Sequence, residues 1–282
     1  RRESKRGLGH EGFDMYSDPF ITIEEAAGRR DFTINAMAWD SESQELLDPF
    51  GGLIDLEEKI LRHTTKCFKE DPLRVLRGMQ FAGRYALRGA PDTLAMSQDL
   101  LPEYHTLPIE RIWGEWYKWA SQSILPSAGL KFLLQAGWIR VYPELKSLID
   151  CPQDPEFHPE GDVWTHTLLV TDEAAAIAER DGLAKDERVV LIFAALCHDL
   201  GKPSTTETID GRIRSRGHCD TVEIFQAFLA RIGAPFGTVE RVIALCRYHL
   251  THVDFKDSLR HVRRLSVSLA AAGETLEMLG RL

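Results

Sequence analysis

Four residues in the second half of the chain are candidate ligands of a divalent metal ion: His166, His198, Asp199 and His218. His198 and Asp199 follow the apolar segment 188–197, where burying two polar side chains is costly unless they have a partner. A single histidine is more often a satisfied core residue. A buried His-Asp pair with histidines on neighbouring helices is better explained by a divalent metal, and imidazole with carboxylate suits Mg, Mn, Ni, Fe or Zn. Such an ion would lower the pKa of a bound water and so generate a nucleophile, which makes Asp199 a catalytic candidate.

The first half contains a carboxylate and a guanidinium three residues apart, Asp71 and Arg74, with Arg77 one turn later. Asp71 and Pro72 suit the start of a helix, so the simplest interpretation is a capped amphipathic helix with a solvated ion pair. The sharper hypothesis is recognition of a base. A carboxylate only accepts and a guanidinium only donates, which matches the amino group beside the ring-nitrogen acceptor of cytosine and adenine. Uracil and guanine present the reverse order, so the pair would select C and A without a nucleic-acid template.

Composition describes an ordinary globular protein of one to three domains: 282 residues, 44% hydrophobic and 27% charged. The net charge of −9 is spread evenly, which argues against a basic domain that coats DNA, so an RNA partner would be held by local patches. No apolar run approaches membrane-spanning length. The five cysteines are scattered, without a C-x-x-C, which is typical of reduced thiols. We therefore expect a cytoplasmic protein with no membrane and no DNA partner.

Most of the chain has helical periodicity, and strand patterns are confined to its start. Residues 21–27 resemble a helix start capped by Thr22, the alternation in 29–40 predicts a strand at least in part, and 45–52 predicts its hairpin partner. Aromatic residues at helical spacing in 109–119 predict a core-facing stripe. The proline-rich segment 151–161 is the best candidate for a linker. Helices are expected over 53–61, 72–88, 91–101, 108–120, 127–136 and most of the remainder, with a glycine cap after the helix that ends at His198.

Three stretches of the first half carry ordered motifs: Arg-Arg-Asp in 29–37, Asp-Pro-Phe-Gly-Gly in 48–52 and Glu-Asp-Pro-Leu-Arg in 70–77. Their order and spacing resemble the later motifs of bacterial tRNA nucleotidyltransferases, the CCA-adding enzymes and poly(A) polymerases of the Arg-Arg-Asp class. The resemblance covers about residues 1–150. It implies transfer of CMP and AMP from CTP and ATP to the 3′ end of tRNA, with Mg²⁺ as the catalytic ion. It implies nucleotide-binding roles for Arg30 at the nucleotide, Asp31 at the sugar, Asn35 in support of the pocket, Asp71 and Arg74 at the base, and Arg77 at a phosphate.

The chain departs from that family in two places. A basic residue usually follows Arg77 by three positions, and here it is Gln80, so one phosphate contact is expected to be absent or supplied elsewhere. The Gly-Gly and Asp-x-Asp motifs that hold Mg²⁺ usually lie upstream, and residues 1–28 contain no such carboxylate pair. Glu3, at the place of a third acidic residue, is a catalytic candidate that cannot hold two ions alone. We therefore expect further sequence before Arg1 and no nucleotide addition by these residues alone.

His166 and the segment His198-Asp-Leu-Gly-Lys202 resemble the HD phosphohydrolase superfamily, whose helical domain is appended to some CCA-adding enzymes. The resemblance spans about 160–282. It implies an all-α domain in which His166, His198 and Asp199 hold a divalent metal such as Ni²⁺, Mn²⁺ or Mg²⁺. The implied reaction is hydrolysis of a 2′,3′-cyclic or terminal phosphate.

Two further histidines and a missing ligand complete this interpretation. His218 and His249 are expected near a second metal position or the substrate phosphate. The family's last ligand is an aspartate on a later helix. Asp254 is a weak substitute for it, and we expect the domain to continue past Leu282.

Together these features predict an α+β, mostly α protein in three parts. Residues 1–62 would be the C-terminal part of a nucleotidyltransferase head with the remnant of a small mixed sheet, 63–150 a helical neck that binds nucleotide and RNA, and 160–282 the HD domain. Two alternatives are a stand-alone metal-dependent phosphohydrolase and a non-catalytic RNA-binding protein. An upstream Asp-x-Asp would select nucleotidyl transfer, and metal-dependent hydrolysis without it would select the hydrolase. A homodimer is left open.

Overall fold

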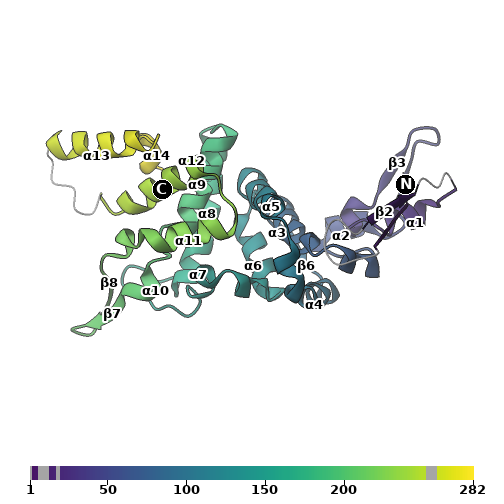
Figure 1. Ribbon diagram of the computed structural model, residues 1–282, viewed down its shortest axis with the longest axis horizontal. Helices are drawn as coiled ribbons and strands as arrows, with labels where there is room; N and C mark the ends of the chain where they lie inside the picture. Colours follow the sequence, from purple (N-terminus) through teal and green to yellow (C-terminus); the bar gives the residue numbers. More distant parts are fainter. Residues whose placement is uncertain (1, 6–12, 17–19, 252–258) are drawn as a thin grey trace. The chain divides into compact units, whose positions relative to one another are not determined.

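The computed structural model describes residues 2–5, 13–16, 20–251 and 259–282, with the backbone alone described in the first two stretches. The chain divides into two compact units, Arg1–Val141 and Tyr142–Leu282, which are described separately below (Figure 1). The boundary falls inside the stretch 63–150 that the sequence suggests as one neck. In the described part of the chain, no helix has both the length and the apolar character needed to cross a membrane.

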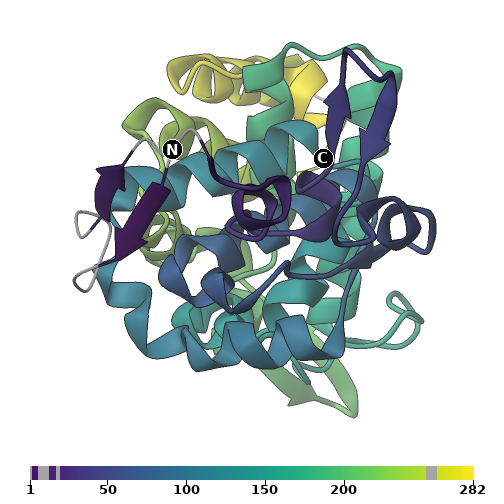
Figure 2. The same ribbon diagram turned by 90° about the vertical axis from the view of Figure 1, so that its right-hand side faces the viewer.

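The first unit begins with short strands that form separate two-stranded sheets. Figure 2 shows the first hairpin as the darkest purple strands, and a second hairpin in blue-purple follows it. Strand β1 pairs antiparallel with β2, β3 pairs antiparallel with β4, and β5 pairs parallel with β6. The elements up to the first long helix are β1 Arg2–Lys5, β2 Phe13–Tyr16, α1 Ile23–Ala27, the 3₁₀ helix η1 Thr33–Asn35, β3 Ala38–Asp40, β4 Glu45–Leu47, α2 Gly52–Glu57, β5 Ile60–Leu61 and η2 Lys66–Glu70.

Helices make up the rest of the first unit. Helix α3 packs against both α5 and α6. Trp116, Trp119 and Phe132 fill the space between these helices, and each has at most 1% of its surface exposed. The predicted aromatic core stripe is thereby confirmed. The elements are α3 Leu73–Tyr85, β6 Arg88–Gly89, α4 Pro91–Asp99, η3 Leu101–Thr106, α5 Ile109–Gln122, α6 Pro126–Gln135 and η4 Trp138–Val141.

The second unit is built around α9, whose residues 188–197 are all buried. Helices α8 and α12 pack along it, and the antiparallel hairpin β7–β8 adds strands to a domain expected to be wholly helical. The elements are α7 Pro143–Lys146, α8 Val163–Arg180, α9 Lys185–Cys197, α10 Lys202–Thr205, β7 Thr206–Ile209, β8 Arg212–Ser215, η5 His218–Asp220, α11 Val222–Arg231, α12 Phe236–Tyr248, α13 Leu259–Ala271 and α14 Leu276–Leu279.

Several expected elements are confirmed and others are wrong. Thr22 caps α1 as predicted, and the β3–β4 hairpin forms. The alternation in 29–40 gives only three residues of strand, because the backbone turns at Phe32–Asn35 into η1 instead. The helix predicted over 53–61 ends at Glu57. Lys59 then adopts a positive φ of 59°, and the next two residues join β6 as a strand.

Candidate functional site

The six residues predicted to bind nucleotide line one cavity of about 520 Å³ in the first unit. They come from the turn around η1, from Asp71 just before α3 and from the first two turns of that helix, and α5 closes the opposite side. The lining contains five cationic and three acidic side chains, in a chain whose net charge is −9. The lining residues are Arg30, Asp31, Asn35, Asp71, Leu73, Arg74, Arg77, Arg111, Gly114, Glu115 and Lys118.

Asp31 holds one wall of this cavity together. Its carboxylate is buried, with 4% of the residue exposed. Oδ1 accepts from the Phe32 backbone N–H at 3.0 Å and from Asn35 Nδ2 at 2.9 Å, and Oδ2 accepts from Arg77 Nε at 2.5 Å. Arg30 Nη1 donates to the backbone oxygen of Asn35, which closes the turn. Asp31 thus fixes the position of Arg77, and its role at the nucleotide sugar stays a prediction.

Asp71 and Arg74 are both fixed by neighbours: the Arg74 backbone N–H donates to the Asp71 carbonyl oxygen at 3.0 Å, and no hydrogen bond between their two side chains is found among the described residues. Asp71 Oδ1 caps the Leu73 N–H at 3.0 Å, and Oδ2 accepts from Arg111 Nη2 at 2.9 Å. Arg74 donates from Nη1 and Nη2 to the backbone oxygens of residues 67 and 29. A carboxylate has about four acceptor sites and a guanidinium five N–H donors, so both groups keep capacity for a base edge.

Helix α5 supplies cavity residues that the sequence argument missed. Arg111, Glu115 and Lys118 fall at i, i+4 and i+7, on the face of α5 next to that of the buried tryptophans, and Lys118 Nζ lies 2.8 Å from Glu115 Oε1. That charged periodicity was the available signal. Gln80 is buried and does not line the cavity, so the lack of a basic residue at position 80 does not remove a charge from the lining. Helix α5 contributes two cationic side chains to that lining.

In the second unit, backbone geometry brings the metal-ligand candidates to one place. Asp162 caps α8 by accepting from the Thr165 N–H at 2.9 Å, which sets His166 in the first turn. His198 and Asp199 follow α9 directly. The expected glycine cap is wrong, because Gly201 has an ordinary φ of −79°. Its lack of a side chain serves another purpose: a Cβ there would lie 2.3 Å from the His218 carbonyl oxygen.

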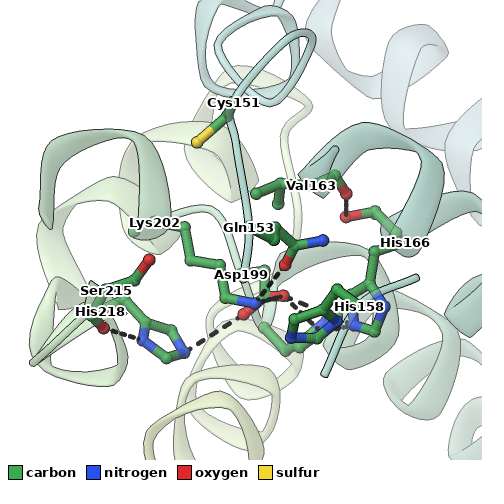
Figure 3. A network of polar contacts seen from close by, with 12 residues as sticks. Cys151, Gln153, His158, Val163, His166, Asp199, Lys202, Ser215 and His218 are labelled. Carbon is green, nitrogen blue, oxygen red and sulfur yellow. Dashed lines mark hydrogen bonds and ion pairs between the residues drawn. The ribbon is translucent and has the colours of Figure 1, made fainter. Parts of the chain in front are cut away.

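The carboxylate of Asp199 is the centre of this cluster, and only 1% of the residue is exposed. Oδ2 lies 3.1 Å from His198 Nε2 and 3.6 Å from His166 Nε2, while Oδ1 lies 3.2 Å from His218 Nε2 and 4.0 Å from His249 Nε2. Figure 3 shows His166 and His218 pointing at Asp199 from opposite sides. The partners of the two carboxylate oxygens among the described residues are these imidazoles and the ammonium of Lys202.

The histidines are oriented by their other ring nitrogens. The Nδ1 atoms of His198, His218 and His249 lie 2.6 to 2.8 Å from backbone carbonyl oxygens, and Nδ1 of His166 lies 2.6 Å from Glu160 Oε1. Because these partners only accept, each Nδ1 carries a proton and each Nε2 is directed at the cluster. As a result, the Nε2 atoms of His166 and His198 face each other at 3.3 Å, and those of His218 and His249 face each other at 3.4 Å. Such contacts require a cation, either a proton or a metal.

The pKa values show where a proton lies when no metal is bound. Burial raises the pKa of Asp199, but His198, His218 and Lys202 outweigh it and hold that pKa well below its usual range. Burial lowers the pKa of His218, but the hydrogen bond with Asp199 outweighs it and raises that pKa to about 10. Burial, reinforced by His198, lowers the pKa of His249 to about 3. The site therefore holds a carboxylate and a neighbouring imidazolium, and a divalent metal would replace the proton of that imidazolium.

The segment 151–161 contributes to the site and is more than the linker the sequence suggested. Glu160 accepts from His166, and Gln153 Oε1 accepts from Lys202 Nζ at 2.6 Å. Lys202 Nζ also lies 2.7 Å from Asp199 Oδ2. Gln153 and Lys202 line a cavity of about 1180 Å³ together with the four histidines, Asp199 and three arginines from and beside β8, Arg212, Arg214 and Arg216.

Two candidate residues fall where side chains are not described. Glu3 lies in β1 opposite Met15, with only its backbone described. Asp254 lies outside the described residues. Their roles stay predictions.

The donor set fits a divalent metal. A buried carboxylate surrounded by imidazole Nε2 atoms of fixed tautomer is the arrangement that such an ion needs. One ligand atom each from His166, His198 and Asp199 lie within 4.8 Å of one another, and the same holds for His218, Cys219 and His249.

Two family models match this chain. The one described as the poly A polymerase head domain matches residues 3–62, and the one described as the HD domain matches residues 163–273. Domains of these two kinds are generally dependent on divalent metals.

Curated relatives match along the chain. The multifunctional CCA protein of Stenotrophomonas maltophilia (strain K279a) is 40% identical over 290 residues, which cover 100% of this chain and 66% of that protein. That of Xylella fastidiosa (strain M12) is 40% identical over 262 residues, covering 89% of this chain and 59% of that protein. The chain thus spans 59 to 66% of the length of these relatives.

Solved structures share the fold. An apo tRNA-processing enzyme matches with a TM-score of 0.54 and 24% identity, over 92% of this chain and 67% of that one. A CCA-adding enzyme in complex with CTP matches with a TM-score of 0.52 and 18% identity, over 92% of this chain and 57% of that one.

Proposed function

Because this chain belongs to the CCA protein family, in which a poly(A) polymerase head domain precedes an HD domain, we propose that its first unit binds CTP and ATP during nucleotide addition to tRNA. The whole protein would add CMP and AMP to the tRNA 3′ end, with Mg²⁺ at catalytic carboxylates. The observation that carries the proposal is the cationic cavity between α3, α5 and the turn at η1.

The cavity can recognise both ends of a nucleoside triphosphate. Asp71 and Arg74, each held in place by backbone contacts, would present an acceptor beside a donor to cytosine or adenine. Arg77, fixed by Asp31, and Lys118 would bind phosphate oxygens. Because these side chains are ordered before the nucleotide arrives, binding does not have to pay for ordering them.

Calorimetric titration of the chain with CTP, ATP, UTP and GTP tests this proposal. CTP and ATP should bind more tightly than UTP and GTP, and Arg74→Ala should remove most of the difference. Lys131→Ala, on α6 and outside the cavity lining, is the control and should bind as the unaltered chain does. Equal affinity for all four nucleotides would contradict base selection by Asp71 and Arg74.

We propose further that the second unit is a metal-dependent phosphohydrolase acting on 2′,3′-cyclic or terminal phosphates. The supporting observation is the convergence of four imidazole Nε2 atoms on the buried Asp199 carboxylate. A divalent ion bound there supplies a Lewis acid and a water of lowered pKa. His166, His198 and Asp199 would hold it, Lys202 would orient Asp199, and the arginines at 212, 214 and 216 would neutralise the substrate phosphate.

Hydrolysis of 2′,3′-cyclic AMP in the presence of Mn²⁺ tests this activity. Asp199→Asn should abolish hydrolysis and weaken Mn²⁺ binding, while Asp186→Asn, in the first turn of α9, should change neither. Equal rates in Asp199→Asn and the unaltered chain would reduce the His-Asp pair to a structural role. A homodimer and a cytoplasmic location stay predictions.

A further inference from the structure

The cluster around Asp199 contains a thiol that the phosphohydrolase proposal does not use. Cys219 directly follows His218 in η5, and its Sγ lies 3.6 Å from His218 Nε2 and 3.7 Å from His249 Nδ1. One ligand atom from each of these three residues lies within 4.8 Å of the others. Cys219 is partly exposed, so an ion can reach it.

Two of the separations match those expected around a tetrahedral ion. Bonds of about 2.0–2.1 Å to nitrogen and about 2.3 Å to sulfur place two nitrogens about 3.4 Å apart, and a sulfur and a nitrogen about 3.6 Å apart. The two Nε2 atoms of His218 and His249 are 3.4 Å apart, and Sγ lies 3.6 Å from His218 Nε2. Asp199 Oδ1, at 3.2 Å from His218 Nε2, would be the fourth donor.

A second observation points to a ligand at this place independently of the cysteine. Asp199 Oδ1 is buried, and the groups that face it among the described residues are the Nε2 atoms of His218 and His249. It faces the 218–249 histidine pair, whereas Oδ2 faces the 166–198 pair and Lys202. The two oxygens therefore serve two separate donor sets, and only the set at Oδ1 contains sulfur.

We infer that Cys219 is a metal ligand that, with His218, His249 and Asp199, forms a site selective for a thiophilic divalent cation such as Zn²⁺ over Mg²⁺. Thiolate is a soft ligand that Zn²⁺ and Co²⁺ accept and that Mg²⁺ avoids. As the metal–sulfur bond forms, the thiol proton and the His218 proton leave to solvent. This inference deepens the proposed phosphohydrolase by assigning a metal class to half of its site, but it can fail while that activity stands.

Co²⁺ is the probe, because a Co²⁺–thiolate bond gives a sulfur-to-metal charge-transfer band in the near ultraviolet that nitrogen and oxygen ligands do not. Titration of the unaltered chain with Co²⁺ should produce this band, and Zn²⁺ should displace it. Cys219→Ser should remove the band and weaken Zn²⁺ binding by roughly tenfold or more, since even supporting groups cost a metal site about that much. Cys67→Ser, a cysteine of similar exposure in the first unit, is the matched control and should keep the band.

The outcomes separate this inference from the proposed activity. Loss of the band in Cys219→Ser, with an unchanged circular dichroism spectrum, supports the thiolate ligand. Co²⁺ binding without the band in the unaltered chain, or a band that survives in Cys219→Ala, overturns it. If Mn²⁺-dependent hydrolysis that requires Asp199 persists in either of those cases, the phosphohydrolase proposal stands without the thiolate.

Discussion

Replacing Asp31 by asparagine tests whether the nucleotide cavity is ordered before it is filled. The carboxylate accepts three hydrogen bonds, from Phe32, Asn35 and Arg77. An asparagine side chain has one oxygen and one NH₂ group. In either orientation its NH₂ group faces a donor, so the isosteric change breaks the clamp without leaving a hole.

The size of the effect follows from what each contact contributes. A hydrogen bond to a charged group contributes roughly 1.5–3 kcal/mol to folding, and the partial exposure of Arg77 favours the lower end. A released Arg77 must be ordered again when nucleotide binds, which costs about 0.5–1.5 kcal/mol, or roughly 2- to 12-fold in affinity. Asp31→Asn should therefore lower the free energy of unfolding by about 1–2 kcal/mol and weaken CTP binding within that range.

Urea unfolding and calorimetric CTP titration measure the two effects separately. Asp99→Asn is the control, because its ion pair with Lys69 is exposed and neither residue lines the cavity, so both quantities should change little. CTP binding in Asp31→Asn as tight as in the unaltered chain would refute the view that Asp31 orders Arg77 for the phosphates.

Two further predictions concern packing and pH. Gly129→Ala would place a Cβ 2.5 Å from the Met79 carbonyl oxygen, where α6 meets α3, and should lower the free energy of unfolding in urea by about 1–3 kcal/mol, whereas Gly114→Ala on α5 meets no atom within 4 Å and should not. Hydrogen bonds from the side chains of Arg180 and Arg281 lower the pKa of Asp181 to about 2. The ionised carboxyl therefore stabilises the fold above about pH 4, and this stabilisation is lost as the pH falls toward 2. Arg281→Ala should raise the pKa of Asp181 toward 3.8, and an unchanged NMR titration midpoint would contradict the assignment.

The sequence predicted the residues of the candidate sites better than the residues around them. The type of a side chain can be read from the sequence, whereas contacts between segments far apart in the sequence depend on the fold. The i, i+3 spacing of Asp71 and Arg74 indicates one helix face, and both line one cavity. Arg111 lies 40 residues from Asp71 in sequence, and only the packing of α5 on α3 reveals that they pair. The hydrogen bond from His166 to Glu160 was likewise hidden, because prolines and glycines in 151–161 mark irregular backbone without saying what it contacts.

Strand alternation failed at one place for a physical reason. Residues 32–36 alternate apolar and polar side chains, but the hydrogen bonds around Asp31 close a turn there. Local hydrogen bonds of side chains thus outweigh the alternating pattern, because the strand available for pairing, β4, is only three residues long. The His-Asp cluster was predictable as a set of residue types, while the pairing of His218 with His249 at Oδ1 of Asp199 required the positions of η5 and α12.

The most direct test of the metal-dependent site is a crystal of the chain grown with Mn²⁺, with diffraction data collected to show its anomalous signal. An anomalous peak within bonding distance of Nε2 of His166 and His198 and of Oδ2 of Asp199 is the predicted result, and crystals of Asp199→Asn should lack it. Density that shows Lys202 alone against Asp199, with no anomalous peak at the histidines, would contradict the account.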